Sequence, residues 1–70
     1  MEYTGNCRRM HSTALGEDVD ILEYKGKHSV TYCYCSRCGK PILREMYVVQ
    51  SAETALEIMY LGSECVKYLE

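Results

Sequence analysis

Apolar and polar side chains alternate along much of the chain after residue 18, and a period of two is typical of β-strands. One alternating stretch leads from residue 19 into a turn at 25–27, and another leads out of that turn over 30–34. The pattern predicts a first β-hairpin. Its apolar positions are Val19, Ile21 and Tyr24 before the turn, and Val30, Tyr32 and Tyr34 after it.

The alternation returns after residue 41 and predicts a second hairpin. A polar turn at 51–54 separates its two strands, and a helix over 52–60 is the alternative, because these residues are good helix formers. We favour the strand, since it brings the chain directly back toward the earlier cysteines. The positions that share a face are Ile42, Arg44, Met46 and Val48 in the first strand, and Leu56, Ile58 and Tyr60 in the second.

The two ends of the chain differ in pattern. Residues 1–17 show little hydrophobic periodicity, so we expect a poorly ordered segment or a short strand from Arg8 to Leu15. The stretch "GSECVKYLE" at 62–70 predicts a short terminal helix with Ser63 as its N-cap. Val66 and Leu69, three residues apart, would share its inner face.

Length and composition indicate one small domain that needs a staple. The chain has 70 residues, seven Tyr, and neither Phe nor Trp, so its core is small. Its five cysteines are an odd number, which argues against a fully paired disulfide framework. There is no apolar leader at the start and no run of about 20 apolar residues. We therefore expect a cytoplasmic protein whose thiols are reduced, and clustered reduced thiols usually bind metal.

The stretch "CSRCGKPI" at 35–42 has the spacing of a zinc knuckle. The gap between Cys35 and Cys38 lets the chain reverse so that both sulfurs face one ion, while backbone N–H groups donate to them. Gly39 suits a position of positive φ, and Arg37 and Lys40 place positive charge beside the sulfurs. A redox dithiol normally opens a helix, which the residues after Cys38 would break, so zinc is favoured over redox-active or inert thiols.

These residues resemble the treble-clef class of small zinc proteins. "YCSRCGKPI", a predicted hairpin and "YLGSEC" opening a helix follow in the order of that class, particularly of small phage and bacterial members. The resemblance covers residues 34–70 and implies that Cys35, Cys38 and Cys65 bind zinc. It implies an α+β fold: a small metal-stapled domain over 1–70 with two β-hairpins, the knuckle and a short C-terminal helix. In this class the helix supplies two ligands, and Gly62 stands where the second would be.

The fourth ligand is therefore open, because a closed structural zinc site takes four. We expect Cys7, a thiol in a polar stretch with no apolar neighbours to bury it. Cys33, His28, His11 and a water molecule are the alternatives. Cys33 lies two residues before Cys35, and along one strand that separates the side chains by roughly 6 to 7 Å, which is wide for one ion.

No pattern for catalysis stands out, so we expect a protein that is not an enzyme. The formal net charge is −2, and the basic residues are scattered, whereas nucleic-acid binders normally carry a basic stripe. We predict a zinc-binding protein-interaction or adaptor module of phage or bacterial accessory type. The alternative is a nucleic-acid-binding zinc module. It would gather Arg8, Arg9, Arg37, Lys40 and Arg44 on one face and stack bases on Tyr32 or Tyr34.

Overall fold

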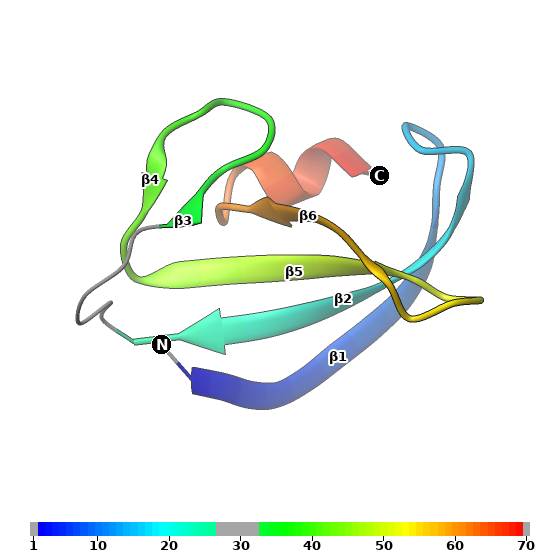
Figure 1. The fold of residues 1–70 in the computed structure, drawn as a ribbon, viewed down its shortest axis with the longest axis horizontal. Helices are drawn as coiled ribbons and strands as arrows, with labels where there is room; N and C mark the ends of the chain where they lie inside the picture. Colours follow the sequence, from blue (N-terminus) through cyan, green and yellow to red (C-terminus); the bar gives the residue numbers. More distant parts are fainter. Residues whose placement is uncertain (1, 27–32, 70) are drawn as a thin grey trace.

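The computed structural model describes residues 2–26 and 33–69. Within these residues an antiparallel sheet has the strand order β1-β2-β5-β6, and β3 pairs with β4 in a separate two-stranded sheet (Figure 1). The protein is thus mostly antiparallel strand with little helix. The elements are β1 (Glu2–Ser12), β2 (Glu17–Lys25), β3 (Cys33–Tyr34), β4 (Pro41–Ile42), β5 (Glu45–Ser51), β6 (Glu57–Leu61) and the 3-10 helix η1 (Cys65–Leu69).

The core is built around the two inner strands of the larger sheet. Ile21 of β2 pairs with Val49 of β5, so both side chains lie on one face, and both are buried. The buried Val66 and Leu69 come from η1 and join the same core, as the sequence predicted. In the described part of the chain, no helix is long and apolar enough to cross a membrane.

The first predicted hairpin is replaced by a different pairing. β2 pairs with β1 on one side and with β5 on the other, and its register with β5 runs from Val19–Ser51 to Lys25–Glu45. Tyr34 instead pairs with Pro41 of β4. Because β1 and β5 occupy both edges of β2, the strand over residues 19–25 has no edge left for a local hairpin partner. Val30 and Tyr32 lie outside the described residues.

The second predicted pair of strands is present, and the helical alternative is not what forms. β5 pairs with β6 in an antiparallel arrangement, and backbone hydrogen bonds close the turn between them. The Ser51 N–H donates to the Leu56 carbonyl (3.0 Å), and the Ala55 N–H donates to the Ser51 carbonyl (2.9 Å). β5 begins at Glu45, because residues 41 and 42 belong to β4.

The N-terminal segment forms the 11-residue edge strand β1, longer than the strand expected from residue 8. Most of its side chains are exposed, so a hydrophobic pattern could not reveal it. Its order comes from pairing with β2 and from the turn that follows it. The buried Ser12 holds that turn: its carbonyl accepts from the Gly16 N–H (2.8 Å), and its Oγ accepts from the Leu15 N–H (3.2 Å).

Candidate metal centre

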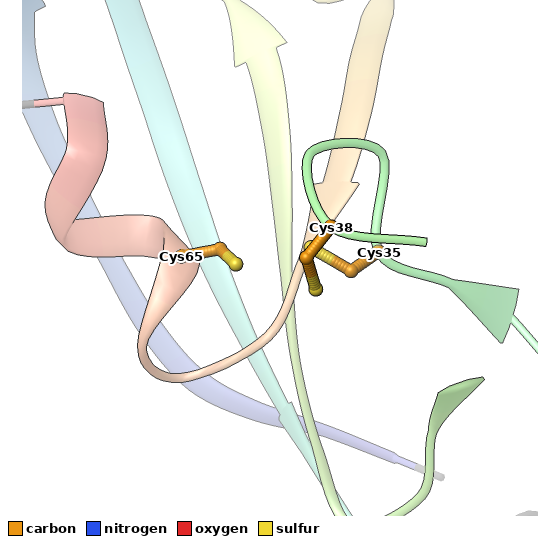
Figure 2. A group of neighbouring side chains, drawn as sticks. All are labelled: Cys35, Cys38 and Cys65. Atoms are coloured by element: carbon orange, nitrogen blue, oxygen red, sulfur yellow. The ribbon is translucent and has the colours of Figure 1, made fainter. Parts of the chain in front are cut away.

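Three cysteines from two distant segments meet beside the core. The sulfurs of Cys35, Cys38 and Cys65 all lie within 4.8 Å of one another. Figure 2 shows Cys35 and Cys38 on the loop after β3 and Cys65 at the start of η1, with the three side chains directed toward a common point. Cys35 and Cys65 are buried and Cys38 is exposed, so the group lies at the surface of the core.

The loop from Cys35 to Lys40 is a tight reversal held by its own backbone. The Gly39 N–H donates to the Cys35 carbonyl (2.9 Å), and the Cys35 N–H donates to the Lys40 carbonyl (2.9 Å). Gly39 has φ +76°, the left-handed conformation that the sequence predicted for it and that glycine adopts without strain. The loop therefore holds its two sulfurs on one side of the chain.

Strand β6 leads to the third cysteine of the group, Cys65. That strand ends at Leu61, and Gly62 begins the reversal into η1, where the Val66 N–H donates to the Gly62 carbonyl (3.0 Å). Since η1 begins at Cys65, the turn directs this cysteine back toward the loop (Figure 2). The approach depends on the pairing of β5 with β6 and on the burial of Leu69, whose side chain is 1% exposed.

The surroundings shift the pKa values of the Cys35 and Cys65 thiols in opposite directions. Burial opposes the thiolate of Cys35, but hydrogen bonds to its sulfur outweigh burial and lower its pKa to about 6. The backbone donors belong to Cys38, Gly62 and Arg37. The pKa of Cys65 is raised, chiefly by its hydrogen bond with Cys35 and then by that with Cys38. Cys35 therefore becomes a thiolate, the form in which a thiol binds metal, at a lower pH than Cys65 does.

Arg37 links the loop to η1. Its guanidinium lies over the ring of Tyr68, 4.2 Å from the ring centre, in a cation–π contact. The same side chain hydrogen-bonds to the Cys65 sulfur and opposes the rise in its pKa. The positive charge of Arg37, which the sequence placed next to Cys35 and Cys38, therefore also lies close to Cys65.

The donor set fits a zinc ion. Zinc binds thiolates at about 2.3 Å with tetrahedral geometry, which places bound sulfurs roughly 3.8 Å apart. Sulfurs within 4.8 Å of one another need only small side-chain rotations to reach that spacing. Soft thiolate ligands suit zinc better than magnesium or calcium, which prefer oxygen. Cys35, Cys38 and Cys65 could therefore hold a metal ion, as the sequence predicted for these three residues.

The expected fourth ligand lies elsewhere in the structure. Cys7 is exposed on the edge strand β1, where it pairs with Leu22, and the metal-binding group of the described residues does not include it. Cys7 lines a pocket together with Ser63 and Val66, which flank Cys65 in the sequence. A ligand role for Cys7 stays a prediction that metal binding must test.

The alternative fourth ligands have different positions. His11 lies on β1, where its Nδ1 is 2.8 Å from Asp18 Oδ1 in an exposed contact. The backbone of Cys33 pairs with Ile42 at the base of the small sheet. The Cys33 side chain and His28 lie outside the described part of the structure. The sequence analysis also missed Tyr68 and the backbone of Gly62, because neither carries a signal until η1 folds against the loop.

Comparison with known protein families, with curated proteins and with solved structures finds no match to this chain. The cysteine group and the fold that surrounds it are therefore the basis for a functional assignment.

Proposed function

We propose that this chain is a non-enzymatic zinc-binding protein in which the metal holds the loop of Cys35 and Cys38 against the start of η1. The approach of the Cys35, Cys38 and Cys65 sulfurs to within 4.8 Å carries the proposal. A structural zinc site adds binding free energy directly to folding, on the order of 10 kcal/mol in small domains. The bound ion would supply this cross-link, with Arg37 donating to one of its thiolates.

The proposed role for the metal is structural because two of its three ligands belong to the core. Cys35 and Cys65 belong to the same buried cluster as Val66 and Leu69. A metal at this position joins segments about 30 residues apart, and in a chain of 70 residues such a link offsets much of the entropy lost on folding. The treble-clef resemblance points in the same direction, and we keep it as part of this proposal.

Metal content and native mass test the zinc site. Protein purified without chelator should carry one zinc per chain, and amide NMR spectra should lose their dispersion after complete chelation, because the core alone is small. A folded chain free of metal would overturn the proposal. Dispersion that survived complete zinc removal would show that the metal is dispensable for the fold.

We further propose that the protein acts in the cytoplasm by contacting another protein. Apolar side chains that stay exposed support this, since Tyr rings and aliphatic side chains are favoured at protein interfaces. The net charge of −2 disfavours tight non-specific binding to phosphates. The exposed large apolar residues of the described chain are Tyr3, Tyr34, Leu43, Leu56, Ile58 and Tyr68.

Nucleic-acid binding is the second candidate, and one observation favours it. Arg37, Lys40 and Arg44 line one hollow beside the metal centre, together with Glu45 and Glu64. The exposed Tyr34 pairs with Pro41, which also lines this hollow. Arg9, by contrast, is held by Asp20 at 2.8 Å across β1 and β2. A mobility shift assay with mixed DNA and RNA at low salt separates the two functions. Binding that weakens steeply with salt would favour nucleic acid, and no shift would favour a protein partner.

A further inference from the structure

An apolar pocket of about 190 Å³ opens next to the metal centre. The buried side chains of Leu61 from β6 and Leu69 from η1 form part of its lining. Leu15 and Met59, both partly buried, also line it. Figure 1 shows why these segments meet, since η1 runs from the end of β6 toward the turn between β1 and β2.

The size of the pocket suits one bulky apolar side chain. An enclosed apolar cavity of about 150 Å³ holds a benzene ring, so 190 Å³ accommodates the side chain of Leu, Met or Phe. Burying such an anchor in a preformed pocket is how many protein interfaces gain most of their affinity. The aromatic ring of Tyr68, 57% exposed, stands at the edge as a further contact surface.

One charged residue lines this pocket, among those that the structure describes there: Arg37. Its guanidinium lies over the Tyr68 ring, 4.2 Å from the ring centre, which places its positive charge beside the pocket. Stacking uses the face of the guanidinium and leaves N–H groups in its plane to donate. Such a group matches the geometry of a carboxylate.

We propose that this pocket binds a short segment of another protein in which a bulky apolar side chain stands next to an aspartate or glutamate. The apolar side chain enters between Leu15, Met59 and Leu61, and the carboxylate pairs with Arg37. The inference rests on the proposed zinc site, because the metal would fix the loop that carries Arg37. It deepens the proposed function by naming the surface and the chemistry of the partner.

Selection from a displayed library of random heptapeptides, using the zinc-loaded full chain as bait, tests the proposal. The selected peptides should share a Leu, Met or Phe next to an Asp or Glu. Ala14→Phe places a ring at the mouth of the pocket from an exposed turn position that lines it, and should weaken binding of a selected peptide at least about tenfold. Arg37→Gln should weaken it about threefold, as expected for a partly exposed ion pair.

Two variants serve as matched controls. Thr13→Phe adds the same ring one residue earlier in the turn, outside the pocket lining, and Lys40→Gln removes a charge from the same loop without touching the pocket. Both should bind the peptide within twofold of the unmodified chain. Ala14→Glu, a smaller change at the same exposed site, repels the carboxylate and provides a second test if Ala14→Phe does not fold.

The outcomes separate this inference from the zinc site. A zinc-loaded chain that enriches no such peptides, or one whose Ala14 variants bind as well as the Thr13 control, overturns the pocket and leaves the metal site intact. A native dimer that Ala14→Phe converts to a monomer shows instead that a second copy of the chain occupies the pocket. A chain that carries no zinc overturns the metal site, on which the inference rests.

Discussion

Ser36 and Tyr60 exchange two hydrogen bonds that join the cysteine loop to strand β6. The Ser36 N–H donates to the Tyr60 carbonyl (2.8 Å), and the Tyr60 N–H donates to the Ser36 Oγ (3.2 Å). Since β6 is an edge strand, these bonds use backbone groups that face away from β5. They place Cys35 beside the segment that carries Cys65, so the metal centre depends on an ordinary sheet edge.

Ser36→Ala should therefore lower the free energy of unfolding of the zinc-loaded protein by about 0.5 to 1 kcal/mol. The variant removes the side-chain acceptor of the Tyr60 N–H and leaves the other bond in place. Denaturant unfolding monitored by circular dichroism measures the change. Thr13→Ala, which removes an exposed hydroxyl from the turn after β1, should change stability less, and an equal loss in both variants would contradict the role assigned to Ser36.

Cys65→Ser and Cys7→Ser should differ in zinc content. Cys65→Ser should reduce bound zinc to well below one per chain, because its sulfur lies within 4.8 Å of the Cys35 and Cys38 sulfurs. Cys7 lies outside this group of sulfurs, so the three-cysteine group alone predicts that Cys7→Ser keeps its zinc, whereas a fourth-ligand role for Cys7 predicts that zinc is lost. Elemental analysis of both purified variants measures this. Zinc lost from Cys7→Ser would show that Cys7 supplies the fourth ligand.

Gly39→Ala should destabilise the folded protein by about 1 kcal/mol, because an L-residue with a side chain is strained at φ +76°. Open space surrounds the added Cβ, so the cost comes from the backbone alone. Gly62→Ala is the matched control, since the space there is equally open and its φ is not in the left-handed region. Thermal unfolding of the two zinc-loaded variants should give a lower midpoint for Gly39→Ala; equal midpoints would contradict the argument.

Asp20 contributes stability that depends on pH. Its hydrogen bond with Arg9 lowers the pKa of the Asp20 carboxyl below its ordinary value. Because the folded pKa is depressed, this contribution is present above the unfolded pKa and is lost as pH falls through the folded value. NMR titration should show the pKa rising in Arg9→Gln. Arg8→Gln removes the same charge at the neighbouring position and should leave the pKa of Asp20 unaltered. An equal rise of this pKa in both variants would show that net charge, and not the hydrogen bond with Arg9, causes the shift.

The alternation of side chains predicted the positions of several strands but not their partners. Residues 19–25 form a strand in which Val19 and Ile21 are buried, because alternation there reflects which side chains face the core. Residues 57–61 also form a strand, but its predicted apolar face is exposed at Ile58, and the buried side chain is that of Leu61. The pairing of β2 with β5 rather than with residues 30–34 was missed, since a period of two is the same for every possible partner. The length of β1 was underestimated because most of its side chains are exposed, so apolar and polar residues do not alternate along it.

The sequence by itself determined the local chemistry of the metal centre. The two-residue spacing of Cys35 and Cys38 and the left-handed Gly39 belong to one short loop, whose geometry depends mainly on its own backbone. Only the tertiary structure decided that Cys65 reaches this loop and that Arg37 lies on Tyr68 beside an apolar pocket. Those relationships join segments far apart in the chain, and they follow from sheet order and burial, which no local pattern of residues specifies.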